Sequence, residues 1–424
     1  MLDGMAATLV AGTSLRDRYL GRTPRSRELF ERAARSLPGG STRTTVFSPP
    51  YPPYLVGGAG ARITDADGNS YLDLLGNYMS LILGHAHPAV VAAVERQVRL
   101  GSAFASPTEL EVELAEEIRR RLPSIERVRF TNSGTEATMF ALRAARAATG
   151  RQLIGRFERS YHGTHDAVVN GPGVPDAVRE LTIELPWDDL NGVARALANR
   201  EREVAAIIIE PVQGAGGIRA ADGGFLGELR DYSRSHGILL IFDEIICFRI
   251  DPNGAQGAYG VTPDLTTLGK IVGGGYPMAA FGGSAEVMDR FDARRPDALV
   301  HGGTFNGNPV AAAAGLATLR ELTPDAYARL AALGGRLASQ LRGGLQAAGL
   351  SGTVNQVASL FEVRLDGAAP TDQWLGLLLE GFHLAPRGMG GLSTAITEDD
   401  VDEFVRAAVR VGQELTLTPA RDAG

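Results

Sequence analysis

Residues 239–244 read Leu-Leu-Ile-Phe-Asp-Glu, a run of four apolar residues that ends in two carboxylates. A continuous apolar run of this length is typical of a strand that is buried on both faces of a sheet. In an open α/β sheet, a polar side chain at the carboxyl end of such a strand faces the crevice where ligands bind. Asp243 is therefore the first candidate for a functional residue.

Similar apolar runs alternate with helical patterns on both sides of this segment. The predicted strands are 128–131, 153–157, 205–210, 239–243 and 279–282, and the predicted helices include 136–148, 226–236 and 309–319. Alternation of this kind predicts an α/β fold, with a mostly parallel central sheet flanked by helices.

The two ends of the chain follow another pattern, which predicts a smaller α+β domain. Short strands near 61–64 and 71–74 flank a turn at 65–68, and a long helix, a strand pair and a final helix follow residue 323. We expect three parts: an N-terminal arm with part of the small domain (1–87), a large domain (88–322) and the rest of the small domain (323–424).

Composition limits the possible partners of the chain. A net charge of −7 and a pI near 5.6 argue against nucleic acid or an anionic membrane surface as a partner. Cys247 is the only cysteine, so no intrachain disulfide can form. The N-terminus has no basic and apolar signal pattern, and no apolar run has the length of a membrane span. We expect a cytoplasmic protein.

Lys270 is the only lysine among 424 residues. An arginine-rich surface explains why other lysines are absent, but it does not explain why this one is present. A position that keeps lysine calls for an amine that can lose its proton and attack a carbonyl, which guanidinium cannot do. Together with the glycines at 273–275, this predicts a Schiff-base lysine on a loop that faces a ligand.

Residues 130–137, Phe-Thr-Asn-Ser-Gly-Thr-Glu-Ala, lie where a strand ends and a helix begins. Ser133, Gly134 and Thr135 offer hydroxyls and free N–H groups at the positive end of a helix dipole, which suits a phosphate, although an ordinary N-cap is the alternative. The carboxylate of Asp243 suits a pyridinium nitrogen. Combined with Lys270, these residues predict a pocket for pyridoxal 5′-phosphate (PLP).

The chain resembles the class III (subgroup II) aminotransferases of PLP fold type I. It is similar to the branch of glutamate-1-semialdehyde aminomutases and β-phenylalanine-type aminotransferases. The resemblance spans about residues 25–415 and rests on blocks at 81–88, 130–137, 160–163, 210–214, 242–244, 264–275 and 303–309. It implies that Lys270 forms the Schiff base and shuttles a proton, that Asp243 holds the pyridine nitrogen, and that Tyr161 stacks on the ring beside His162.

The same resemblance implies further contacts with PLP. Ser133, Gly134 and Thr135 would bind the phosphate, and Glu210 and Gln213 would belong to the pocket, with Gln213 near the ring hydroxyl. Thr304 would reach the phosphate from the neighbouring subunit, which implies a homodimer.

Three residues are predicted on the substrate side. Arg43 follows Pro-Gly-Gly-Ser-Thr at 38–42, where both related enzymes carry an arginine for a substrate carboxylate, and a surface arginine is the alternative. By the same resemblance, Tyr78 would form a wall of the substrate pocket. Arg387 would be a second carboxylate contact or a turn residue.

Departures from the aminomutase pattern favour a transaminase. The segment 243–249 is one residue shorter, 163–185 is too short for the usual mobile gate, and Ala215 stands where other class III transaminases place a gating Glu. The segments 254–257 and 303–309 lean towards the aminomutase. We therefore predict a PLP-dependent transfer of the amino group from a β- or ω-amino acid to an oxo acid.

Three alternatives remain open: the aminomutase reaction, a racemase or epimerase on the same fold, and a non-catalytic scaffold. His85 with His87, and His162 with His165, have metal-like spacings. Without nearby cysteines they favour a structural or cofactor-adjacent role, so we predict no metal.

Overall fold

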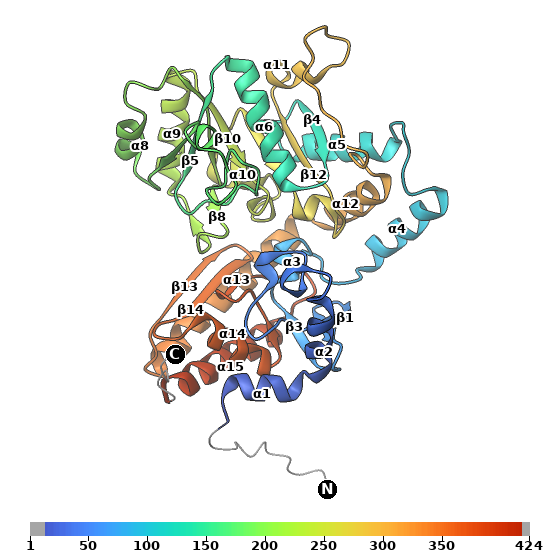
Figure 1. Ribbon diagram of the computed structural model, residues 1–424, viewed down its shortest axis with the longest axis vertical. Coiled ribbons are helices and arrows are strands. Elements are labelled where there is room, and N and C mark those ends of the chain that lie inside the picture. Colours follow the sequence, from blue (N-terminus) through green and yellow to red (C-terminus); the bar gives the residue numbers. More distant parts are fainter. Residues whose placement is uncertain (1–12, 418–424) are drawn as a thin grey trace.

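The computed structural model describes residues 13–417. Its upper lobe contains a seven-stranded sheet in the order β4-β12-β11-β10-β7-β5-β6 (Figure 1). Neighbouring strands are parallel except at β12, which is antiparallel to both β11 and β4. The predicted mostly parallel sheet is confirmed. Its strands are β4 (Arg127–Thr131), β5 (Leu153–Phe157), β6 (Thr182–Leu185), β7 (Val204–Ile209), β10 (Leu239–Asp243), β11 (Leu265–Leu268) and β12 (Ala279–Gly283).

Helices cover both faces of this sheet, which explains its continuous apolar strands. In β10, Ile241 packs on the face covered by α6 (Gly134–Thr149), while Leu240 and Phe242 pack on the face of α8 (Leu190–Leu197) and α9 (Gly223–Ser235). A fully buried side chain of this size contributes about 1.5–3 kcal/mol. Burial on both faces therefore fixes β10, and with it the position of Asp243.

Two strands of the sheet escaped prediction. β11 reads Leu-Thr-Thr-Leu, and β6 reads Thr-Ile-Glu-Leu, so neither shows a continuous apolar run. Thr266 and Thr267 are nevertheless completely buried. The hydroxyl of Thr267 donates to Asp243 at 3.1 Å, which satisfies a polar group that burial would otherwise destabilise.

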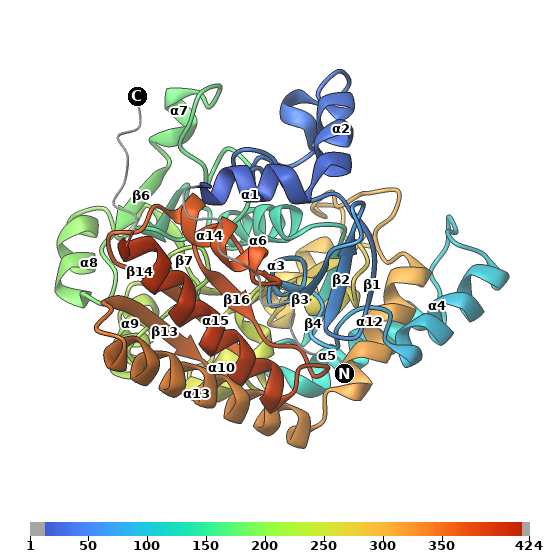
Figure 2. The same ribbon diagram turned by 90° about the horizontal axis from the view of Figure 1, so that it is seen from below.

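The lower lobe combines both ends of the chain (Figures 1 and 2). Its four-stranded sheet has the order β1-β2-β3-β15, and the C-terminal β15 pairs in parallel with the N-terminal β3. Its elements include β1 (Leu55–Ala59), β2 (Arg62–Asp65), β3 (Ser70–Asp73), β13 (Gly352–Val357), β14 (Leu360–Leu365), β15 (Phe382–His383), β16 (Met389–Gly391), α13 (Pro324–Ala347), α14 (Pro370–Leu379) and α15 (Glu398–Leu417). The division of the chain at residues 88 and 323 stays a prediction.

The N-terminal segment is helical in its described part. Residues 1–12 lie outside the described residues, but α1 (Leu15–Arg22) and α2 (Pro24–Ala33) are folded helices. Tyr19 is 1% exposed and donates to the backbone oxygen of Tyr51 at 3.0 Å. Tyr19 is the one buried residue of α1, so the helix has no apolar stripe for a sequence pattern to show.

The remaining elements are short or connect the two lobes. They are α3 (Gly76–Met79), α4 (Pro88–Leu100), α5 (Glu109–Arg121), α7 (Asp176–Arg179), α10 (Gly254–Tyr259), α11 (Ala285–Met288), α12 (Pro309–Glu321), β8 (Val212–Gln213) and β9 (Arg219–Ala220), with 3₁₀ turns η1 (Pro38–Gly40), η2 (Thr44–Val46), η3 (Cys247–Arg249), η4 (Lys270–Gly273) and η5 (Asp289–Phe291). Within residues 13–417, no helix has both the length and the apolar character that crossing a membrane requires.

Candidate active site

Lys270 lies two residues beyond the carboxyl end of β11, at the start of η4. β10 and β11 are parallel, with Asp243 opposite Thr267, so the lysine follows the strand beside the one that ends in the carboxylate. Burial lowers the pKa of Lys270, and the carboxylates of Asp243 and Glu210 act in the opposite direction. A lowered pKa increases the neutral, nucleophilic fraction of the amine.

Asp243 is 2% exposed and is held by three donors. Its Oδ2 lies 2.7 Å from Nδ1 of His162, and its Oδ1 accepts from Thr267 Oγ1 at 3.1 Å and from the Ile245 N–H at 3.2 Å. These contacts fix the carboxylate at the edge of the sheet. The other ring nitrogen of His162 is buried and has no partner among the described residues.

Two side chains of the segment 210–214 hydrogen-bond to the backbone around Tyr161. Glu210 accepts from the backbone N–H of Tyr161 at 2.9 Å and from that of Gly214 at 3.1 Å. Gln213 donates to the backbone oxygen of Glu158 at 2.7 Å. Burial raises the pKa of Glu210 to about 7, while its contact with His162 acts the other way. The Tyr161 side chain remains 48% exposed.

The Gln213 side chain is held against the segment that precedes Tyr161. Its Oε1 faces Gly216, where an added Cβ would lie 2.6 Å away, and this oxygen is buried without a partner. Its Nε2 also contacts Ser160 Oγ at 3.2 Å. In this structure Gln213 supports the backbone that leads to Tyr161, and its predicted place near the ring hydroxyl stays a prediction.

The predicted phosphate residues lie at the N-terminus of α6. Ser133 is the N-cap and accepts from the Glu136 N–H at 3.3 Å, and its contact with a phosphate stays a prediction. Thr135 packs closely on Gly163, where an added Cβ would lie 2.5 Å from Thr135 Oγ1. The first N–H groups of the helix, including those of Gly134 and Thr135, have no intrahelical partner and can bind an anion.

These residues fit PLP. The carboxyl ends of β4, β10 and β11 lie at the same edge of the sheet, because β4 and β11 are both antiparallel to β12. That edge presents the N-terminus of α6 for a phosphate, Asp243 for a pyridinium nitrogen and Lys270 for an aldehyde. The fold and this arrangement are those of a PLP-dependent enzyme. The amine follows β11, the carboxylate ends β10, and the helix N-terminus that suits a phosphate follows β4.

Thr304 is exposed on the loop that precedes α12, and its predicted role in a neighbouring subunit stays a prediction. The loop is tied to the phosphate region, because Asn132 Nδ2 donates to Asn306 Oδ1 at 2.8 Å. Thr304 also lines a cavity of about 600 Å³ between residues 103–108 and 303–309. Sequence reasoning missed Asn132 and Asn306, because asparagines near a helix start suggest only caps.

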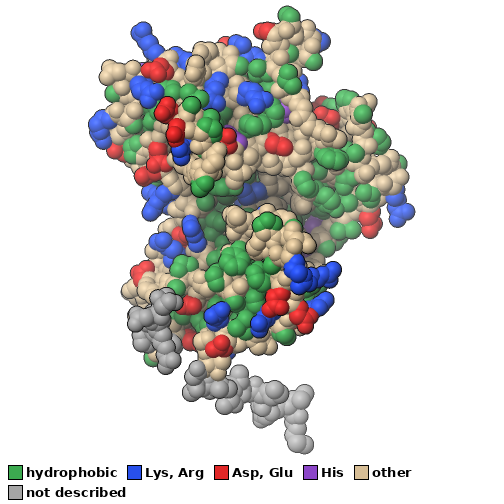
Figure 3. All heavy atoms as spheres, in the orientation of Figure 1, with side chains coloured by type: hydrophobic (Ala, Val, Ile, Leu, Met, Phe, Trp, Pro, Cys, Tyr) green, Lys and Arg blue, Asp and Glu red, His purple; other side chains and the backbone are tan. Residues whose placement is uncertain are grey.

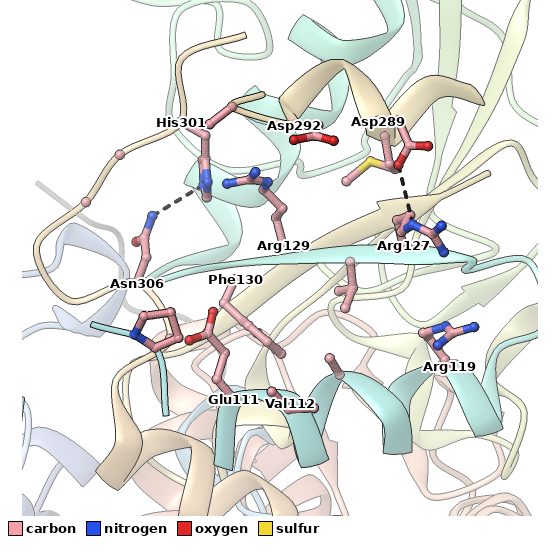
Figure 4. A pocket seen from close by; sticks show the side chains of 18 of the residues that line it. Glu111, Val112, Arg119, Arg127, Arg129, Phe130, Asp289, Asp292, His301 and Asn306 are labelled. Carbon is pink, nitrogen blue, oxygen red and sulfur yellow. Dashed lines mark hydrogen bonds and ion pairs between the residues drawn. The ribbon is translucent and has the colours of Figure 1, made fainter. Parts of the chain in front are cut away.

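A larger cavity, of about 870 Å³, lies away from Lys270 (Figure 4). It is bounded by α5, the edge strand β4 and the segment 288–307. Arg127 pairs with Asp289 at 3.4 Å, and Asn306 lies 3.3 Å from His301. This cavity is lined by both arginines and acidic residues. None of these charged residues lies among the predicted residues of the site around Lys270.

On the substrate side, Arg43 and Tyr78 lie together in the lower lobe. Both line a cavity of about 160 Å³, along with Asn77 and the apolar side chains of Leu55, Trp374 and Leu384. Arg43 Nη1 donates to Asn77 Oδ1 at 3.1 Å, and its guanidinium carbon lies 5.9 Å from the centre of the Tyr78 ring. The Tyr78 hydroxyl donates to the backbone oxygen of Thr45.

Arg387 does not join this cavity. It is exposed on the turn between β15 and β16, and its neighbour Pro386 lines the cavity instead. Burial raises the pKa of Glu362, and Arg364 and Arg387 act in the opposite direction, so Arg387 lies within electrostatic reach of Glu362. Its role as a second carboxylate contact stays a prediction.

The helix α3, which carries Tyr78, is a left-handed turn. Gly76, Asn77, Tyr78 and Met79 have φ of +53°, +49°, +56° and +68°. A left-handed conformation costs about 1–2 kcal/mol for most residues other than glycine, and asparagine tolerates it best among them. Sequence patterns do not reveal this turn, because Tyr78 and Met79 ordinarily avoid the conformation.

His85 and His162, one histidine of each predicted pair, contact carboxylates. His85 Nε2 lies 2.7 Å from Asp73, which also contacts His383 at 3.0 Å. Burial opposes ionisation of Asp73, but its bonds with these two histidines lower its pKa. Within residues 13–417, no group of three or more His, Cys, Asp or Glu side chains has the arrangement of a metal site.

Comparison with known proteins agrees with this geometry. The chain is 39% identical to glutamate-1-semialdehyde 2,1-aminomutase 2 of Bacillus licheniformis, over 92% of this chain and 98% of that protein. It superimposes on an omega-transaminase of Sphaerobacter thermophilus with a TM-score of 0.88, 44% identity and coverage of 92% and 97%. For a β-phenylalanine aminotransferase of Variovorax paradoxus the TM-score is 0.89, with 34% identity and coverage of 96% and 98%.

The family model for class-III aminotransferases matches residues 48–368. The chain therefore belongs to the class III aminotransferases, and it is a PLP-dependent enzyme of this family. The resemblance, the fold and the cofactor that the sequence predicted are confirmed.

Proposed function

We propose that this enzyme transfers the amino group of a β- or ω-amino acid to an oxo acid in two half-reactions at one site. The observation that carries the proposal is the placement of Arg43. Among the described residues its guanidinium contacts Asn77 and Tyr78 and pairs with no carboxylate. Its free donors therefore suit the carboxylate of a substrate, which a planar guanidinium binds through two parallel hydrogen bonds.

The side chains have separate roles in this proposal. When bound, PLP supplies an aldehyde for the amine and a ring that withdraws electrons from the substrate carbon. Lys270 would carry the proton from that carbon to the aldehyde carbon of the cofactor, and would carry it back in the second half-reaction, because burial favours its neutral form. Asp243 would keep the ring nitrogen protonated, and Tyr161 would pack on the ring face. Ser133, Gly134 and Thr135 would hold the phosphate, with Thr304 of the partner subunit.

The transaminase reading has one supported alternative. The Bacillus licheniformis relative carries the aminomutase name, and its identity to this chain is 39% over almost its full length. In an aminomutase both half-reactions take place on one substrate. The short 243–249 segment and Ala215 favour transfer between two substrates instead.

We also propose that the active unit is a cytoplasmic homodimer. Large apolar side chains are exposed around the Thr304 loop and along α4: Val98 (48%), Leu100 (72%), Phe104 (50%), Val300 (84%) and Phe305 (57%). Figure 3 shows apolar side chains gathered on the side of the upper lobe that carries α4. A contiguous apolar surface of this kind is typical of a protein interface. A second copy covering it would bring its Thr304 loop towards the site.

The test of the function uses the purified holoenzyme and a panel of amines. The panel contains β-phenylalanine, other β-amino acids, α-amino acids, an ω-amine and 4,5-diaminovalerate. We expect β-amino acids to bleach the absorption of bound PLP, and we expect 2-oxoglutarate or pyruvate to restore it. A response to diaminovalerate alone would establish the aminomutase reaction and refute the transaminase proposal.

A further inference from the structure

The left-handed turn Gly76–Met79 places two side chains beside Arg43. Asn77 and Tyr78 have φ and ψ of (+49°, +59°) and (+56°, +49°), so both are in the left-handed helical region. In this conformation Asn77 contacts the guanidinium at 3.1 Å, and the Tyr78 ring lies 5.9 Å below it. A costly backbone conformation that persists beside a binding residue suggests a functional constraint.

The surrounding structure holds the turn firmly. Met79 donates its N–H to the Leu75 oxygen at 2.8 Å, and its own oxygen accepts from Nη1 of the buried Arg249 at 3.0 Å. Asp73 accepts from the N–H groups of Leu75 and Gly76 at 3.0 and 3.1 Å. Arg249 lies in η3, six residues after Asp243, so the turn is anchored on the segment that follows the cofactor-side carboxylate.

We propose that Asn77 is a positioning residue, which orients Arg43 so that the guanidinium receives the carboxylate of the amino-acid substrate. This inference rests on the proposed function and adds a residue that determines specificity. Asn77 uses its neutral amide oxygen, so it fixes the guanidinium without neutralising it. A carboxylate at the same place would form an ion pair with Arg43 and compete with the substrate.

Two substitutions separate orientation from folding. Asn77→Gly removes the amide but accepts the left-handed conformation without strain, and Asn77→Asp keeps the shape but adds a charge. The matched control is Asn199→Gly, because Asn199 is exposed, has φ +67° and lies beyond α8 in the upper lobe. The assay compares β-phenylalanine with 1-phenylpropylamine, which lacks the carboxylate.

In the holoenzyme, Asn77→Gly should raise KM for β-phenylalanine about tenfold, the effect of losing one hydrogen bond to a charged group. Asn77→Asp should raise it further. The KM for 1-phenylpropylamine and the kcat for both amines should stay unchanged. The thermal midpoint of Asn77→Gly should be equal to or higher than that of the wild type, as for Asn199→Gly.

Three results would overturn the inference: an unchanged KM for β-phenylalanine in both Asn77 variants, an equal rise for both amines, or a fall in the midpoint with Asn77→Gly but not with Asn199→Gly. The variant Arg43→Gln shows whether a negative result concerns only the role of Asn77 or the proposed function itself. If Arg43→Gln raises KM for β-phenylalanine and the Asn77 variants do not, only the role of Asn77 is wrong. If Arg43→Gln also leaves KM unchanged, the carboxylate site itself is wrong.

Discussion

The cofactor side and the substrate side of this enzyme are built in different ways. Asp243 and Lys270 follow the ends of neighbouring strands, β10 and β11, whose buried side chains fix their positions. Arg43 and Asn77 instead lie on short turns of the lower lobe, and Asn77 adopts a left-handed conformation. Strand ends of a buried sheet hold side chains more precisely than turns do, because the surrounding core fixes their backbone.

Removing the amine should have the largest effect, because it tests the centre of the cofactor side. Lys270→Ala should lower kcat by about a thousandfold or more, since both nucleophile and proton carrier are lost. Lys270→Arg should be equally inactive, although it keeps the positive charge. Stopped-flow absorption measures the loss, and circular dichroism shows that the fold remains. Normal turnover by either variant would refute the role of Lys270.

Asp243→Asn should have the next largest effect, and it tests whether the strand-end carboxylate acts on the cofactor. We expect kcat to fall about a hundredfold, because the ring nitrogen loses a preorganised negative partner. The matched control is Glu244→Gln. Glu244 is also fully buried, but it accepts from the backbone N–H of Ala255 at 2.6 Å and from the side-chain amide of Gln256 at 3.0 Å. Equal losses in the two variants would show that burial of a carboxylate, and not its contact with PLP, matters here.

Arg43→Gln tests the substrate side and should show the opposite kinetic signature. KM for the amino-acid donor should rise about tenfold to a hundredfold with little change in kcat, because the guanidinium binds a group that does not react. Steady-state kinetics with Arg35→Gln, a change at another exposed arginine of the lower lobe, provides the control. A fall in kcat at constant KM would place Arg43 on the cofactor side instead.

The smallest effect concerns Glu210, which supports Tyr161. Its pKa rises from 4.5 to about 7 on burial, so the folded state holds the proton more tightly than the unfolded chain. The contribution of this group to stability therefore falls as pH rises from about 4.5 to 7. The stability of Glu210→Gln relative to the wild type should increase across this range, as denaturant unfolding of the holoenzyme at several pH values can measure. A constant difference would show that Glu210 stays ionised.

The sheet and the strand end that carries Asp243 were predictable for a physical reason. Strands buried on both faces must be apolar throughout, so β7 and β10 are visible in the sequence, and a carboxylate at their end is conspicuous. β11 escaped because its threonines satisfy their hydroxyls inside the protein, as Thr267 does with Asp243. Lys270, the only lysine, was nevertheless predicted as a functional residue, and it lies two residues after that strand.

The substrate side was harder to predict because its geometry depends on contacts between distant segments. Arg43 was a candidate by resemblance, but Asn77 was not, since Tyr78 and Met79 ordinarily avoid the left-handed turn that brings Asn77 to Arg43. Arg387 was predicted as a second carboxylate contact or a turn residue, and it lies on the turn between β15 and β16, where its neighbour Pro386 lines the cavity. The orientation of Gln213 likewise follows from the 158–160 segment, which lies more than fifty residues earlier in the chain.

By itself, the sequence determined that this chain builds a covered, mostly parallel sheet, and that an amine, a carboxylate and a helix N-terminus lie at the ends of its strands. These features are local, because burial, strand ends and helix starts leave a mark in the residues themselves. Only the tertiary structure decided how the N-terminal turns meet the Arg249 anchor and how Asn77 reaches Arg43. Those contacts join residues far apart in sequence. The conformational free energy that the left-handed turn costs is offset only when the two lobes pack together.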